Sequence, residues 1–73
     1  MPVDAKAIEE FLHREPFRPF RIITSSGKEY DVRNPALVVV MKRDVFYAYP
    51  GKEDFTIISL THVASVDTIQ QAA

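Results

Sequence analysis

The stretch LVVVMKRDVFYAYPGKEDFTIISL, residues 37–60, decides the fold of this chain. It contains three short runs rich in β-branched and aromatic side chains, over residues 37–41, 45–49 and 55–60. Such side chains favour strands, and three consecutive valines in the first run argue against a helix. The polar segments KRD and PGKED separate the runs, so the pattern predicts three strands joined by a turn and a loop.

The three predicted strands are apolar at consecutive positions, so both of their faces are apolar. A sheet with one face in water would instead alternate apolar and polar residues. We therefore expect a dimer or small ring, since closed symmetric assemblies are the commonest homo-oligomers. The predicted interface includes some of these side chains: Val38, Val40, Phe46, Tyr47 and Tyr49. The sequence does not fix the strand register, so which of them point outward stays open, and a closed monomeric barrel is the competing account.

Upstream of this stretch, the sequence predicts a hairpin. Residues 20–25 and 28–33 alternate in the manner of strands. Ser26-Gly27 lies between them, and Gly27 is free to adopt the positive φ that a tight turn requires. Asn34-Pro35 then breaks the second strand. Downstream, a short last strand is predicted over residues 63–67.

The N-terminal part predicts one amphipathic helix over residues 4–14. Asp4 is a good N-cap, and Ile8, Phe11 and Leu12 form one apolar stripe at i, i+3 and i+4. Pro16 ends the helix because it disfavours the α region at the residue before it. We expect the stripe to dock on the sheet. The segment from Pro16 to Phe20, with two prolines, is expected to be an extended connector.

The expected fold is therefore mainly β. It has one short N-terminal helix followed by a five-stranded antiparallel sheet or a small SH3-like or Sm-like barrel. All 73 residues form one domain, with the sheet over residues 20–67 and a tail over 68–73. No apolar run approaches the length of a membrane span. The expected location is the cytoplasm, with no membrane partner.

Composition argues against an enzyme and against a cofactor or metal site. The chain has no cysteine, and His13 and His62 are its only histidines, too few for the three or four ligands of a metal centre. Gly27 and Gly51 are its only glycines, so no phosphate-cradling loop is expected. Ser59 lies near His62 in the sequence, but no glycine flanks the serine to form the tight turn that presents a catalytic nucleophile.

Four arginines are the candidate nucleic-acid contacts: Arg14, Arg18, Arg21 and Arg33. Phe17 and Phe20 are interleaved with them, and arginine among aromatic side chains can hold phosphates and stack bases. The chain nevertheless has nine basic and ten acidic residues, whereas nucleic-acid binders are usually basic. The favoured interpretation is that the phenylalanines fill the core and the arginines pair with Glu15, Glu29 and Asp31.

Several motifs occur in order along residues 8–67: PFRPFRI, a Gly-Lys hairpin, NPALVVV and FTIISLTHVASVD. Together they resemble a family of short bacterial proteins of unknown function, and the resemblance implies no activity. The order of elements is also similar to that of Sm-like barrels, which form rings and bind RNA. Residues 31–34, DVRN, have the wrong spacing for the Sm-like RNA motif, and Pro50-Gly51 lacks its basic residue before glycine. This second resemblance thus implies the architecture without the RNA site.

The sequence therefore predicts a non-enzymatic binding or assembly module that forms homo-oligomers. The alternative function is an Sm-like RNA- or DNA-binding regulator. A third option is an antitoxin-like or adaptor component that binds a different protein.

Overall fold

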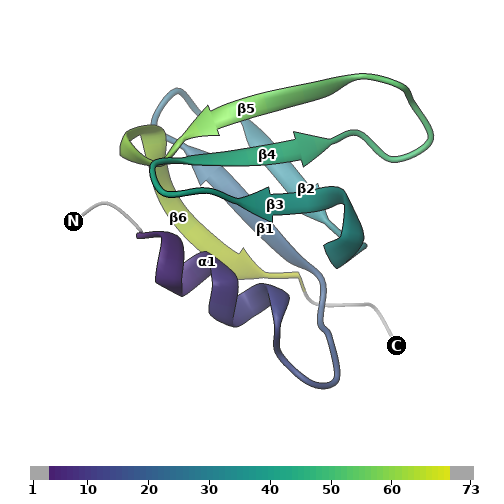
Figure 1. Ribbon diagram of the computed structural model, residues 1–73. Helices are drawn as coiled ribbons and strands as arrows, with labels where there is room; N and C mark the ends of the chain where they lie inside the picture. The colour runs from purple at the N-terminus through teal and green to yellow at the C-terminus, as the bar shows by residue number, and fades with distance from the viewer. Residues whose placement is uncertain (1–3, 70–73) are drawn as a thin grey trace.

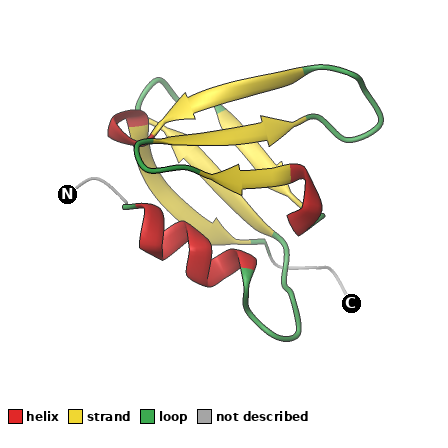
Figure 2. Ribbon diagram, viewed as in Figure 1, coloured by secondary structure: helices red, strands yellow, loops and turns green. Residues whose placement is uncertain are grey.

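The computed structural model describes residues 4–69 and contains one helix and six strands (Figure 1). Two single 3₁₀ turns join strands of different sheets (Figure 2). In chain order the elements are α1 (Ala5–Leu12), β1 (Phe20–Thr24), β2 (Glu29–Val32), η1 (Pro35–Leu37), β3 (Val38–Val40), β4 (Asp44–Ala48), β5 (Phe55–Ser59), η2 (Leu60–His62) and β6 (Val63–Thr68).

The strands form two antiparallel three-stranded sheets, in the orders β2-β1-β6 and β3-β4-β5. The expectation of a mainly β fold with one short helix is confirmed. The expectation of five strands in one sheet or in a closed barrel is wrong. The chain leaves the first sheet at η1, which begins where the Asn34 side chain accepts a hydrogen bond from the N–H of Ala36 at 3.0 Å, and β6 rather than β3 completes that sheet. The predicted break at Asn34-Pro35 is the point where the sheets separate.

Helix α1 begins as predicted, because the Asp4 carboxylate accepts a hydrogen bond from the N–H of Ala7 at 3.0 Å. It ends at Leu12, two residues before the predicted end, with His13 as its C-cap. Ile8 is fully buried, and Phe11 and Leu12 pack against the core. The predicted docking of the apolar stripe is therefore confirmed, and the helix lies against β3 and, through a ring contact of 5.2 Å between Phe11 and Phe20, against β1.

The core lies between the two sheets, which face each other. Its most deeply buried side chains are Ile8, Phe20, Ile22, Val32, Val45 and Val63. Tyr47 crosses from one sheet to the other: its ring contacts that of Tyr30 at 5.2 Å, and its hydroxyl donates to the main-chain carbonyl of Asp31 at 2.7 Å. One tyrosine thus ties the β3-β4-β5 sheet to β2.

The first hairpin agrees with the prediction, and the last strand is one residue longer than predicted. Gly27 turns the β1–β2 hairpin at a φ of 89°. The last strand runs through Thr68, and the N–H of Ile69 donates to the carbonyl of Pro19 at 3.0 Å. The rest of the predicted tail lies outside the described residues. Between residues 4 and 69, no helix is long and apolar enough to cross a membrane.

Candidate interaction surface

The sheet β3-β4-β5 has an inner face that fills the core and an outer face whose middle is also apolar. Across its three strands Val39 lies opposite Phe46, and Phe46 lies opposite Ile57. Val39 and Ile57 are 55% and 56% exposed, although both are large aliphatic side chains. The three therefore form a continuous apolar row across the middle of the sheet.

Two more side chains extend this row along the strands. Phe55 is 58% exposed and stacks on Phe46, with ring centroids 5.0 Å apart. Met41, 39% exposed, follows the end of β3. We call the set of Val39, Met41, Phe46, Phe55 and Ile57 the outer apolar patch. The exposed fractions of Val39, Met41, Phe55 and Ile57 correspond to about 400 Å² of apolar surface at roughly 200 Å² per large side chain. This lies within the roughly 300–600 Å² of the largest apolar patch on a typical monomer, which is often functional.

The five side chains predicted as an interface divide between the two faces. Phe46 lies on the outer face. Val38 and Tyr47 are buried in the core, and Val40 and Tyr49 pack against it. These four belong to the inner face because they alternate with Val39 and Phe46 along their strands.

Sequence reasoning omitted four members of the outer apolar patch: Val39, Met41, Phe55 and Ile57. Their signal was present, since all four lie in the predicted strands 37–41 and 55–60, which are apolar on both faces. Only the register, with Val39, Phe46 and Ile57 in one row, shows that they form a single surface.

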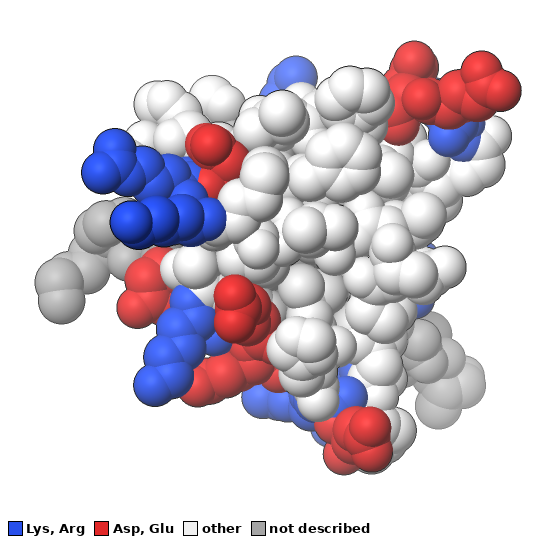
Figure 3. All heavy atoms as spheres, in the orientation of Figure 1, with Lys and Arg blue, Asp and Glu red and all other residues white. Residues whose placement is uncertain are grey.

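The two ends of this surface carry opposite charge (Figure 3). Basic side chains gather at the β3–β4 turn, where Lys42 and Arg43 are exposed. Acidic side chains gather at the β4–β5 loop, where Glu53 and Asp54 are exposed. Because β4 runs from the turn to the loop, the basic and acidic groups lie beyond opposite ends of the same strand. The outer apolar patch lies between them.

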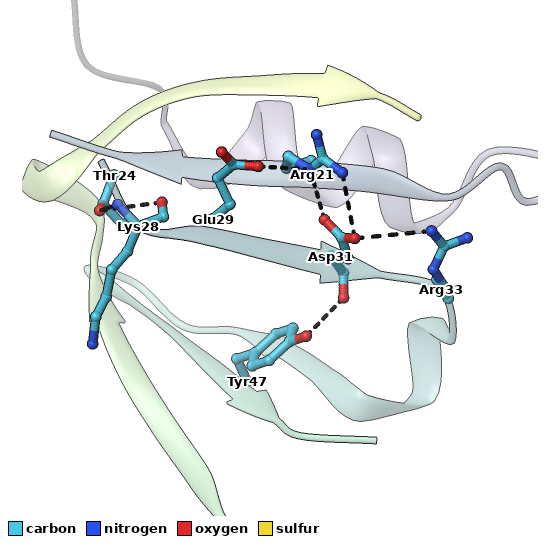
Figure 4. A network of polar contacts seen from close by, with 7 residues as sticks. All are labelled: Arg21, Thr24, Lys28, Glu29, Asp31, Arg33 and Tyr47. Carbon is cyan, nitrogen blue, oxygen red and sulfur yellow. Dashed lines mark hydrogen bonds and ion pairs between the residues drawn. The ribbon is translucent and has the colours of Figure 1, made fainter. Parts of the chain in front are cut away.

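The predicted nucleic-acid residues do not form one free basic surface. The Arg21 guanidinium contacts Asp31, with Nε–Oδ1 at 2.7 Å, and Glu29, with Nε–Oε1 at 3.2 Å (Figure 4). Arg33 lies 3.8 Å from the same Asp31 carboxylate. The hydrogen bond from Arg21 lowers the pKa of Asp31, and the same contact raises the pKa of Arg21. The predicted pairing with Glu29 and Asp31 is confirmed.

The other two arginines lie on a different part of the chain. Arg14 is placed over the ring of Phe11, 5.0 Å from its centroid, in a cation–π contact. Arg18 is exposed in the connector between α1 and β1. The predicted partner Glu15 makes no ion pair with either arginine within residues 4–69. Phe17 and Phe20 pack edge to face at 6.2 Å, with Phe20 fully buried, so Phe20 is a core residue, as favoured, and Phe17 packs against the core.

The hollows of the surface are open, and the two histidines lie in different ones. One hollow of about 620 Å³ is lined by His13, Arg14, Pro16 and neighbouring residues of the α1–β1 connector. His62 lines a smaller hollow of about 180 Å³ beside Thr24 and Lys28. The hydroxyl of Ser59 bonds that of Thr61 at 2.9 Å. Among residues 4–69, no three side chains of the metal-binding types lie together.

Comparison with known proteins gives no family for this chain. No protein-family model, no curated protein and no solved structure matches it.

Proposed function

We propose that this protein is a non-enzymatic assembly module that associates with itself through the outer apolar patch. The observation that carries the proposal is the row Val39–Phe46–Ile57, which is continuous across three strands while its two outer members stay more than half exposed. Removing apolar surface from water is the main driving force of protein association.

The patch is available for a partner because the fold of one chain does not use it. The core is built from the inner face, with Val45 fully buried and Tyr47 bonded across to Asp31. Two copies of the patch would bury about 800 Å² of apolar surface, and the polar surroundings would bring the total towards the roughly 1,200 Å² at the low end of specific interfaces. An interface of this size is typical of weak or transient association.

The alternative function, an Sm-like RNA- or DNA-binding regulator, has less support. Arg21 and Arg33 lie among the carboxylates of Glu29 and Asp31, which compete with phosphate for them. Arg14 and Arg18 belong to a separate segment. Membership in the family of short bacterial proteins that the motifs resemble is compatible with an assembly role and is itself part of the proposal.

The test is the mass in solution, measured by size-exclusion chromatography with light scattering from about 1 to 200 μM. The wild-type mass should rise with concentration from 8.3 kDa towards twice that value. Ile57→Lys places a charge in the row at a site exposed enough to leave the fold intact, and it should keep the protein monomeric. Ala64→Lys, at an exposed position of β6, is the matched control and should associate like the wild type.

Two results would overturn the proposal. One is a wild-type mass that stays at 8.3 kDa over the whole range. The other is association that Ile57→Lys leaves unchanged, with circular dichroism showing that both variants are folded.

A further inference from the structure

We propose that the partner on the outer apolar patch is a second copy of this chain with its strands reversed. The two β3-β4-β5 sheets pack face to face about a two-fold axis that runs across the strands. The acidic β4–β5 loop of each copy then meets the basic β3–β4 turn of the other. This proposal rests on the proposed function and specifies its geometry.

The first argument is the distribution of charge along the sheet. Lys42 and Arg43 lie before β4, and Glu53 and Asp54 lie after it in the loop (Figure 3). The five residues of β4 separate the two groups by about 17 Å at roughly 3.3 Å per residue. Asp44 follows the basic pair and Lys52 precedes the acidic pair. Residues 42–44 together therefore carry one net positive charge, and residues 52–54 together carry one net negative charge. Asp4 lines the same hollow as Lys42 and Arg43.

The second argument is the choice between two symmetries. Sheets that pack face to face keep their strands nearly aligned, so a two-fold axis in the interface runs either along the strands or across them. An axis along the strands would place basic turn on basic turn and acidic loop on acidic loop. An axis across the strands exchanges the ends and places opposite charges together. Since juxtaposed like charges oppose association, the axis across the strands is the favoured one.

The apolar row fits the same axis. Val39, Phe46 and Ile57 lie on a line across the strands, and Phe46 is the central residue of β4. An axis along this line brings each member of the row close to the same residue of the second copy. The patch is therefore complementary to itself both in its apolar centre and in its charged ends. An unrelated partner would need to reproduce this arrangement, whereas a second copy has it already.

The experiment uses charge reversal at each end of the sheet. The first variant is Lys42→Glu with Arg43→Glu, and the second is Glu53→Lys with Asp54→Lys. In a reversed dimer each variant alone places like charges at both contacts, so its dissociation constant should rise about tenfold or more. The four changes combined in one chain restore opposite charges, and its dissociation constant should return towards the wild-type value. An equimolar mixture of the two double variants should form a heterodimer of similar affinity.

The control variant is Arg14→Glu with Arg18→Glu, which changes the net charge by the same amount as the first variant on a segment away from the patch. It should leave the dissociation constant unchanged at 0.15 M salt, where charges more than about 8 Å apart are largely screened. Sedimentation or light scattering supplies the constants, and circular dichroism confirms folding of each variant.

The outcomes separate this proposal from the one on which it rests. A wild-type monomer overturns both. In a second outcome, the wild type dimerises and Ile57→Lys disrupts the dimer, but neither double charge reversal weakens it. This outcome supports the assembly role and overturns the reversed geometry. The same conclusion follows if each double variant alone has the wild-type dissociation constant and the mixture of the two associates more tightly than the wild type. That result requires the β3–β4 turns of the two copies to meet each other, and the β4–β5 loops to meet each other. Loss of association in the fourfold variant, with the chain folded, also overturns it.

Discussion

Replacing Tyr47 by Phe removes one hydroxyl group and, with it, a hydrogen bond that joins the two sheets. The hydroxyl donates to the Asp31 carbonyl at 2.7 Å, and the tyrosine side chain is 5% exposed (Figure 4). The ring itself stays in the variant, so its contacts with Tyr30 and Tyr49, both at 5.2 Å, are kept. Any loss of stability is therefore assigned to the hydroxyl and its acceptor.

The expected loss is about 1–2 kcal/mol. A typical hydrogen bond within a protein contributes roughly 0.5–1.5 kcal/mol, and an acceptor left without its partner away from water adds to the cost. A core as small as this one supplies only about 3–5 kcal/mol in total. The change should therefore lower the urea midpoint by a large fraction of its wild-type value while leaving the slope of the transition unchanged.

Tyr47→Phe also changes the response to alkaline pH. Burial, together with the nearby Asp31 charge, raises the pKa of Tyr47 above its ordinary value of 10.0. The neutral hydroxyl therefore contributes stability that is complete below pH 10 and is lost as the pH rises towards the folded-state pKa. The variant should lose less stability than the wild type over that interval.

The assay is urea unfolding followed by circular dichroism, at low micromolar concentration so that association contributes little. Tyr49→Phe is the matched control, since Tyr49 is half-buried in the same strand region and no side-chain hydrogen bond of its hydroxyl is found within residues 4–69. It should cost a few tenths of a kcal/mol at most. Equal midpoints for the two variants would refute the reasoning that the Tyr47 hydroxyl ties the sheets together.

Two further predictions concern the charged network and the helix. Arg21 lowers the pKa of Asp31 below its ordinary 3.8, so this carboxylate contributes stability that is present above about pH 4 and lost as the pH falls through the folded-state value. Asp31→Asn should flatten the fall of the urea midpoint between about pH 5 and pH 2, and a slope equal to that of the wild type would contradict it. Replacing the fully buried Ile8 by Ala should lower the free energy of unfolding by about 2–5 kcal/mol, which is enough to unfold much of the monomer. Lys6→Ala on the exposed side of α1 should leave the unfolding midpoint almost unchanged, and an unchanged midpoint for Ile8→Ala would show that the helix does not hold the core.

The local features of the fold could be predicted because each depends on neighbouring residues. Asp4 caps α1 with its own carboxylate, and Gly27 supplies the positive φ of the first hairpin. Asn34 and Pro35 together end β2. The Asn34 side chain accepts a hydrogen bond from the N–H of Ala36, and the Pro35 nitrogen has no hydrogen to donate to a neighbouring strand. None of these effects needs knowledge of the rest of the chain.

The separation into two sheets could not be predicted in the same way. It depends on which strands pair across long distances in the sequence, such as β1 with β6. The predicted strand boundaries were correct to within one or two residues, yet the same strands would also have been compatible with one sheet or a closed barrel. The pairing energies that decide between these arrangements lie in contacts that no local pattern records.

The choice of face was the hardest part of the candidate site, because side chains at neighbouring positions of β4 have similar hydrophobicity. Phe46 is the more apolar of the central pair, so transfer from water alone would place it inside and Tyr47 outside. The structure has the opposite arrangement, since the longer Tyr47 side chain spans the gap between the sheets and its hydroxyl finds the Asp31 carbonyl. A one-residue shift of register would exchange every inward and outward side chain of the strand.

That inversion has a consequence for association. With Tyr47 inside, the residues at the centre of the outer face have no polar groups of their own: Phe46, its stacking partner Phe55, and the aliphatic Val39 and Ile57. The Asp44–Ser59 pair lies at the turn end of the same face. A tyrosine in this row could have formed hydrogen bonds to water through its hydroxyl. These apolar side chains, in contrast, are stabilised only when another apolar surface covers them. The arrangement that places Tyr47 in the core thus also places Phe46 at the centre of the outer face, and the proposed association depends on the same register that closes the core.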